Sequence, residues 1–175
     1  MLFDELRLPS NAHLKVAYSG GLDSHVLLHA LSVLRTDHYF SLSAIYIDHD
    51  LQTASTEWGR HCAAICTKLD IQYVVKRVTV AGVADEGMEA AARRARYAAL
   101  AAALEPDDIL LIAHHCDDQA ETVLLQLLRG TGVAGLAAMP MQTVFGPGQI
   151  VRPLLGFSRA ALRVYAQAHQ LGWIE

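Results

Sequence analysis

Two adjacent glycines, Gly20 and Gly21, separate two apolar segments and constrain the fold more than any other feature. The apolar run that begins at Leu14 predicts a buried strand, and the run from Val26 to Leu34 predicts a buried helix. A strand that turns so tightly into a helix leaves backbone N–H groups unpaired at the helix start, and glycine permits the backbone angles of such a turn. The helix dipole adds positive potential there. The turn therefore predicts a concave set of donors for phosphate oxygens.

The turn lacks the lysine of the common P-loop, because no lysine lies between Lys15 and Lys68. On the glycines alone, an ordinary strand–turn–helix junction with Ser24 as the helix cap is the alternative interpretation. The whole segment 19–24 is more specific: Ser-Gly-Gly-x-Asp-Ser is the signature of the PP-loop family, the N-type ATP pyrophosphatases, which this chain resembles. The resemblance implies that the loop holds the pyrophosphate end of ATP and that the α–β bond is broken.

Composition narrows the class of protein. The 175 residues, 53% of them hydrophobic, suffice for the core of one ordinary domain. The acidic pair Asp4 and Glu5 stands where a secretory signal would be basic, and no apolar run approaches the roughly 20 residues that span a bilayer. Three cysteines without a disulfide spacing suggest reduced thiols, so we expect a cytoplasmic protein with no membrane segment. The net charge of −4 argues against a domain that binds nucleic acid by itself.

Segments of strand and helix length alternate along the chain. Strands are expected at Leu14–Tyr18, Ser41–Ile47, Ile71–Val78 and Ile109–Ala113, with Ile150–Leu154 returning briefly to the sheet edge. Helices are expected at Leu2–Leu8, Ser24–Arg35, Thr56–Leu69, Met88–Leu104, from His114–Asp118 to near Arg129, and at Arg159–His169 capped by Ser158. Gly130–Gly148, with seven glycines and prolines, predicts a long loop. The pattern predicts an α/β fold: a doubly wound, mainly parallel five-stranded sheet with helices on both faces.

Polar clusters follow three of the predicted strands, at residues 19–24, 48–50 and 114–121. In parallel sheets of this kind, ligands bind at the carboxyl ends of the strands. We therefore expect the three clusters to meet at one edge of the sheet and to form a site.

The segment from His114 to Thr122 contains many side chains that can take part in catalysis or bind ligands, namely three carboxylates and two imidazoles. Asp117 or Asp118 is expected to cap the following helix, where the dipole favours acids. Carboxylates next to a polyphosphate usually hold Mg²⁺, and they also recognise substrate amines. A zinc site made by the histidines and Cys116 is the weaker interpretation, because no second ligand cluster with zinc spacing exists.

Three arginines lie on the helix predicted at Met88–Leu104. Arg93 and Arg96 share a face and Arg94 points elsewhere. Glu89 stands four residues before Arg93, so an ion pair along the helix is the structural interpretation. The functional interpretation is that one arginine neutralises phosphate or charge that develops in the transition state.

Several motifs occur in a fixed order, at Ser19–Ser24, Gly87–Tyr97, His114–Thr122, Arg129–Met139, Val151–Leu154 and Trp173–Glu175. The series covers essentially the whole chain and resembles the N-terminal domain of the tRNA(Ile)-lysidine synthetase family. Asp50 and Gln52 depart from that family, which usually has Gly and Arg there. Family members continue into further domains that help hold the tRNA. The resemblance therefore implies that residues 1–175 are one PP-loop ATP pyrophosphatase domain and a fragment of a longer protein.

The resemblance implies a ligase that converts the wobble cytidine of isoleucine tRNA to lysidine, with ATP and Mg²⁺. ATP adenylylates the C2 oxygen of the base and releases pyrophosphate, and the ε-amine of free lysine then expels AMP. By resemblance, the phosphates are bound by Ser19, Gly20, Gly21, Leu22, Asp23 and Ser24. Mg²⁺ is assigned to Asp23, Asp117 and Asp118, and the lysine ammonium to the group Asp117, Asp118 and Glu121. Arg93 or Arg96 stabilises phosphate, and His114 transfers a proton because an imidazole titrates near neutrality.

Three other functions remain open at this point. A PP-loop tRNA thiolase would need a catalytic cysteine pair, often Cys-x-x-Cys, whereas three residues separate Cys62 from Cys66. A GMP- or NAD-synthetase-like amidotransferase partner fits the segments Arg129–Met139 and Val151–Leu154 poorly. A non-catalytic adenine-nucleotide-binding module would not need the carboxylates at Asp117–Glu121.

Overall fold

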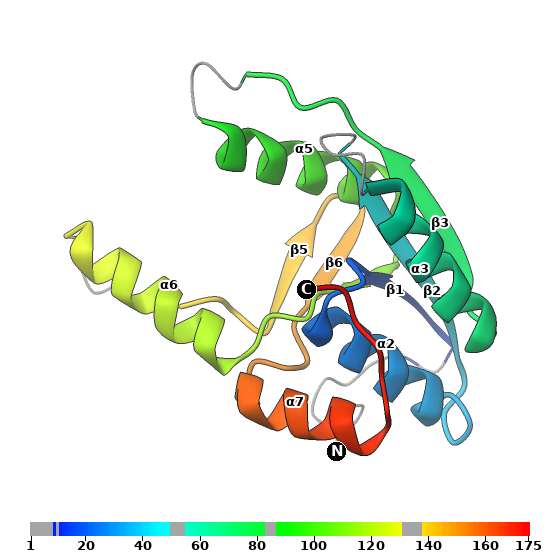
Figure 1. Ribbon diagram of the computed structural model, residues 1–175. Coiled ribbons are helices and arrows are strands. Elements are labelled where there is room, and N and C mark those ends of the chain that lie inside the picture. Colours follow the sequence, from blue (N-terminus) through cyan, green and yellow to red (C-terminus); the bar gives the residue numbers. More distant parts are fainter. Residues whose placement is uncertain (1–8, 10, 50–54, 83–86, 131–137) are drawn as a thin grey trace.

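The computed structural model describes residues 9, 11–49, 55–82, 87–130 and 138–175. Strands and helices alternate along most of this chain (Figure 1). The strands are β1 (Ala12–Ala17), β2 (Phe40–Asp48), β3 (Gln72–Arg77), β4 (Ile109–Leu111), β5 (Gln142–Phe145) and β6 (Gly148–Val151). The helices are α2 (Leu22–Leu34), α3 (Ser55–Lys68), α5 (Met88–Ala102), α6 (Cys116–Leu128) and α7 (Arg159–Ala168). The helix predicted at Leu2–Leu8 lies outside the described residues.

The strands form one sheet in the order β3-β2-β1-β4-β6-β5. Every neighbouring pair is parallel except β5 and β6, which are antiparallel. The predicted α/β class and the mainly parallel sheet are therefore confirmed. The predicted number of five strands is wrong, because the described residues form a six-stranded sheet.

The additional strand, β5, lies inside the segment Gly130–Gly148 that the sequence predicted to be a loop. It pairs with β6 through a tight hairpin in which Phe145 faces Gly148, and Gly146 adopts a φ of +56° in the turn. The surrounding glycines and prolines concealed a strand of only four residues. As a consequence β6 is not the edge strand that we expected, because it lies between β4 and β5.

Both faces of the sheet are covered by helices, as predicted for a doubly wound fold (Figure 1). On one face, residues of α2, α3 and α7 pack with Leu14, Val16 and Leu111 of the sheet. On the other face, Leu100 of α5 packs with Leu110 and other strand residues. All three residues of β4 are buried because this strand has helices on both sides. Each such buried aliphatic side chain stabilises the fold by about 1.5–3 kcal/mol.

Helix α6 begins beyond the carboxyl end of β4 and extends away from the sheet (Figure 1). None of its residues is buried, and Leu128 near its end is 84% exposed. The strand order nevertheless brings the start of α6 next to the start of α2, because β4 pairs with β1. Within the described ranges, no helix is long and apolar enough to cross a membrane.

Candidate active site

The carboxyl ends of β1, β2 and β4 surround a cavity of about 460 Å³. The three polar clusters predicted to meet at this edge all contribute to its wall, so the predicted convergence is confirmed. The polar part of the lining includes Ser19, Gly21, Asp23 and Ser24 after β1, His49 after β2, His114 and Asp118 after β4, and Arg96 of α5. The apolar part of the lining includes Ile45, Ile47, Trp58, Leu100 and Ile112.

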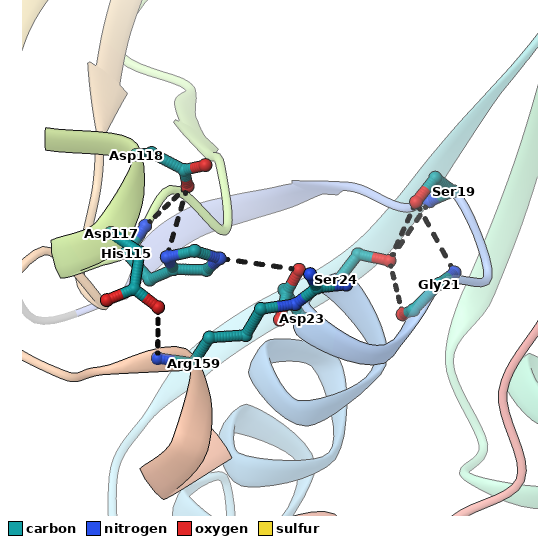
Figure 2. Close-up of polar contacts among 8 residues, drawn as sticks. All are labelled: Ser19, Gly21, Asp23, Ser24, His115, Asp117, Asp118 and Arg159. Carbon is teal, nitrogen blue, oxygen red and sulfur yellow. Dashed lines mark hydrogen bonds and ion pairs between the residues drawn. The ribbon is translucent and has the colours of Figure 1, made fainter. Parts of the chain in front are cut away.

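Two serines close the turn between β1 and α2 (Figure 2). The hydroxyl oxygens of Ser19 and Ser24 lie 3.0 Å apart, and the Ser24 hydroxyl also donates to the carbonyl oxygen of Gly21 at 3.1 Å. The N-cap of α2 is Gly21, which has no side chain to cap the helix, so the alternative interpretation of Ser24 as the cap is wrong. The turn is thus held by its own hydroxyls, and the first N–H groups of α2 have no side-chain cap.

Gly20 is buried behind this turn, and its φ of +82° is one that side chains rarely adopt. A Cβ at this position would lie 2.7 Å from Cδ1 of Ile174 and 2.8 Å from Sγ of Cys62. The N–H of Ile174 also donates to the carbonyl oxygen of Gly20 at 3.0 Å. The C-terminal segment and α3 therefore hold the turn through Ile174 and Cys62, which do not line the cavity.

His115 connects the turn with the start of α6 (Figure 2). This buried imidazole places Nε2 3.7 Å from an oxygen of Asp23, and Nδ1 3.5 Å from an oxygen of Asp118. The same Asp118 oxygen accepts a hydrogen bond from the backbone N–H of His115 at 2.8 Å. The N-cap of α6 is therefore His115, and Asp118 contributes to the cap from the third helical position, which is the form in which the predicted capping by one of the two aspartates is found. His115 itself was missed, since sequence alone did not separate the two neighbouring histidines.

The other predicted carboxylates of α6 do not line the cavity. Asp117 is exposed and accepts a hydrogen bond from the backbone N–H of Arg159, at the start of α7, at 3.1 Å (Figure 2). Glu121 is exposed one helical turn farther along α6. Among the predicted phosphate-loop residues, Leu22 points into the core instead.

The two predicted arginines of α5 occupy different positions. Arg96 is half-buried and lines the cavity, whereas Arg93 is exposed. Both guanidinium groups lie over the ring of Tyr97, at 5.1 Å for Arg93 and 5.6 Å for Arg96. Arg94 points elsewhere, as predicted, and donates to the carbonyl oxygen of Ala81.

His114 lines the cavity in an unusual electrostatic environment. Burial lowers its pKa to about 4, the Asp118 carboxylate opposes this shift, and the charges of Arg152, Arg93 and Arg96 reinforce it. The imidazole is therefore neutral at pH 7, so titration near neutrality is not an argument for proton transfer by His114. The sequence analysis did not single out Arg152, which is buried beside this histidine.

The donor set at the cavity suits a magnesium ion that also contacts phosphate. Oδ1 of Asp23 is buried and has no hydrogen-bond partner among the described residues, and Asp118 lies across His115 from it. In the part of the chain that is described, no three His, Cys, Asp or Glu side chains form a group able to hold a metal ion. Asp23, Asp117 and Asp118 therefore do not form a complete protein cage. Mg²⁺ does not need one, because it commonly takes one or two carboxylates together with substrate phosphates.

Known proteins resemble this chain at two levels. A family model described as a PP-loop domain matches residues 2–175. Among curated relatives, the tRNA(Ile)-lysidine synthase of Coxiella burnetii is 48% identical over 96% of this chain and 37% of its own length. That of Pseudomonas aeruginosa is 53% identical over 91% of this chain and 36% of its own length. The chain thus spans little more than a third of these relatives.

Solved structures share the fold at lower identity. A U34-tRNA thiolase from Methanococcus maripaludis has a TM-score of 0.81 and 21% identity, covering 96% of this chain and 59% of its own. An NAD⁺ synthetase from Burkholderia pseudomallei has a TM-score of 0.51 and 18% identity, and the match covers 98% of this chain and 64% of the synthetase chain. At these identities the likeness concerns the fold alone. Because the PP-loop domain model spans almost the whole sequence and the predicted turn lies at the described cavity, the chain belongs to the PP-loop domain family.

Proposed function

We propose that this chain, as part of a longer protein, ligates free lysine to C2 of the wobble cytidine of isoleucine tRNA. ATP adenylylates the C2 oxygen of the base with release of pyrophosphate, and the lysine ε-amine then displaces AMP. The observation that carries the proposal is the single cavity that joins the turn at 19–24 with His114, Asp118 and Arg96. Relatives named tRNA(Ile)-lysidine synthase, about half identical over nearly all of this chain, favour this reaction over others.

The turn at the start of α2 binds the phosphates of ATP in this proposal. Gly21 is the N-cap, so the first N–H groups of the helix and its dipole favour an anion there. The hydroxyls of Ser19 and Ser24 are already fixed by each other, which limits the reorganisation that phosphate binding requires. Arg96 of α5 adds positive charge to the lining of the cavity. The apolar part of the lining, around Trp58 and Leu100, suits the adenine base.

Asp23 holds Mg²⁺ in this proposal through its buried Oδ1, and Asp118 lies on the other side of the His115 ring, 3.5 Å from Nδ1. When bound, Mg²⁺ would bridge phosphate oxygens and neutralise charge on the departing pyrophosphate. The lysine ammonium is assigned to the acidic start of α6. Asp118 and Glu121 are three residues apart and so lie on the same side of the helix, with Asp117 beside them.

The thiolase alternative is disfavoured by where the cysteines lie. Cys62 and Cys66 lie on the side of α3 that faces the core, and burial raises their pKa values to about 12 and about 11. A thiol with such a pKa is a poor nucleophile at pH 7 because little thiolate forms. Cys116 is exposed at the start of α6, and the described residues hold no metal-binding group that would include it.

The remaining part of the reaction requires protein outside these residues. The net charge of −4 offers little for contacts with tRNA phosphates. We therefore propose that residues 1–175 form a PP-loop ATP pyrophosphatase domain and that further domains hold the tRNA. The chain's coverage of 37% of a relative supports this division. A reaction on ATP and tRNA also favours a cytoplasmic location.

The test is AMP and pyrophosphate release by the full-length protein with ATP, Mg²⁺ and isoleucine tRNA, with and without labelled lysine. We expect AMP release to depend on lysine and the label to appear in the tRNA. Asp118→Asn should reduce turnover at least tenfold, whereas Asp107→Asn, in an exposed turn at a φ of +70° that asparagine tolerates, should not. Turnover that requires a sulfur donor would establish the thiolase instead. ATP binding that is unaffected by Asp118→Asn, without any turnover, would establish a nucleotide-binding module.

A further inference from the structure

Arg152 is a buried arginine next to the cavity, and its position is fixed by the backbone around it. It follows β6 and is only 8% exposed. Its backbone N–H donates to the carbonyl oxygen of Met141 at 2.8 Å, and its Nη1 donates to that of Pro140 at 2.7 Å. Both ends of the residue are therefore held by one segment of chain, so that the guanidinium has little freedom to turn.

The third hydrogen bond of Arg152 reaches the cavity. Its Nε donates to Nδ1 of His114 at 3.2 Å. A guanidinium carries only donors and stays charged in proteins, so Nδ1 must be the acceptor and cannot carry a proton. A neutral imidazole has one proton, which must then sit on Nε2. Protonation of Nδ1 would both break this bond and place two positive groups in contact.

We propose that Arg152 is a positioning residue that fixes His114 as the neutral tautomer protonated at Nε2. His114 then acts as a hydrogen-bond donor toward an oxygen of the substrate in the cavity, and not as a general base. This catalytic use rests on the proposed function, whereas the assignment of the tautomer does not. The lowered pKa of His114 agrees with it: burial lowers the pKa most, the Asp118 carboxylate opposes the shift, and the charges of Arg152, Arg93 and Arg96 lower it further.

A purely structural role is the competing explanation, since Arg152 also joins β6 to Pro140. The two roles differ in what they predict for the histidine. If Arg152 has only a structural role, the tautomer of His114 stays unchanged in a folded variant that lacks the arginine, whereas removal of a positioning arginine changes it. The tautomer is therefore the quantity to measure.

The experiment is nitrogen NMR of the full-length protein labelled with ¹⁵N in histidine, at pH 7 and without substrate, with His114→Gln used to assign the signals. In the unsubstituted protein we expect His114 to show an unprotonated Nδ1 and a protonated Nε2. A protonated Nδ1, or a mixture of both tautomers, would overturn the proposal. Because no substrate is present, this result is independent of whether the lysine ligation takes place.

Variants of Arg152 separate the two roles further. Arg152→Gln keeps an amide donor without the charge and should retain the tautomer, whereas Arg152→Met has no donor and should give a mixture. In the lysine-dependent assay, loss of a hydrogen bond from a charged group predicts a fall in kcat of about tenfold or more, with less change in the KM for ATP. Arg163→Met, on the exposed side of α7, is the matched control and should change neither quantity. An unchanged tautomer in a folded Arg152→Met would overturn the proposal. If Arg152→Met does not fold, the unsubstituted protein and Arg152→Gln still test the proposal, because a protonated Nδ1 of His114 in either protein would overturn it.

Discussion

Alanine at position 20 tests how the turn at residues 19–24 is held in place. Gly20 has a φ of +82°, and for an L-residue this left-handed region costs roughly 1–2 kcal/mol. The added Cβ would also lie 2.7 Å from Cδ1 of Ile174 and 2.8 Å from Sγ of Cys62, both too close for van der Waals contact. Overpacking of a core by one methyl group typically costs about 1–3 kcal/mol. Together the two effects predict a loss of about 2–5 kcal/mol in the free energy of unfolding.

Two other substitutions separate these contributions. Gly130 has a φ of +68°, and no atom of the described residues lies within 4 Å of an added Cβ, so Gly130→Ala is expected to carry only the backbone cost of about 1–2 kcal/mol. Gly156 has neither a positive φ nor a close neighbour, so Gly156→Ala should be nearly neutral. Cys62→Ala removes one of the two clashing atoms, and Gly20→Ala should therefore cost less in that background, by about 0.5–3 kcal/mol.

The assay is unfolding by urea, followed by circular dichroism, with the free energy obtained by linear extrapolation. The order of cost should be Gly20→Ala above Gly130→Ala above Gly156→Ala. If Gly20→Ala costs no more than Gly130→Ala, the contacts with Ile174 and Cys62 do not constrain the turn and the reasoning is refuted. Equal cost of Gly20→Ala with and without Cys62→Ala would refute the contribution of Cys62 alone.

Three further predictions concern charged groups. Lys15→Met should destabilise the fold by about 3–5 kcal/mol in urea unfolding, because Asp108 is only 4% exposed and its carboxylate lies 2.7 Å from the lysine ammonium. An unchanged free energy of unfolding would show that water replaces the lysine ammonium. His115→Ala should weaken magnesium-dependent ATP binding about 10–100-fold in titration calorimetry, because it removes the imidazole that lies between Asp23 and Asp118. Equal weakening of ATP binding in the absence of Mg²⁺ would contradict this role. The pKa of His114 is about 4 in the fold and about 6.5 unfolded, so the unfolded chain binds the proton more readily as the pH falls. Stability should therefore be lost between about pH 6.5 and 4, and His114→Gln should lose less over this range; an equal loss would contradict the lowered pKa.

The sequence predicted the elements with strong local patterns. From β1 to β4 and again at α7, the expected bounds lie within two residues of those observed, because the apolar runs and the cap at Ser158 are local signals. A strand at Ile150–Leu154 was expected, but β5 and its hairpin with β6 were not, since β5 has only four residues among glycines and prolines and depends on pairing with β6. Topology, unlike helix length, is set by contacts between distant residues.

In the candidate site too, the features set by neighbouring residues were predicted and those set by contacts between distant residues were not. The turn at 19–24 was recognised because its residues are adjacent in sequence, and the convergence of strand ends followed from the rule for parallel sheets. The roles of His115 and Arg152 were not recognised. His115 contacts Asp23 from another strand end, and Arg152 reaches His114 from 38 residues away. Nor did the sequence reveal that the Asp117 side chain turns toward α7, because Arg159, its partner there, lies 42 residues farther along the chain.

The groups around the cavity differ in how firmly the protein holds them, and this difference has a consequence for the chemistry. Ser19 and Ser24 fix each other, Gly20 is packed from behind, and Arg152 is anchored by two carbonyl groups. Such preorganised donors require little rearrangement when charge develops on phosphate. The acidic side chains at the exposed start of α6 have fewer constraints of this kind. In the proposed reaction, substitutions at Cys62 or Arg152, which do not line the cavity, should therefore impair the adenylylation step without contacting ATP, whereas changes at Glu121 should act mainly on the use of lysine.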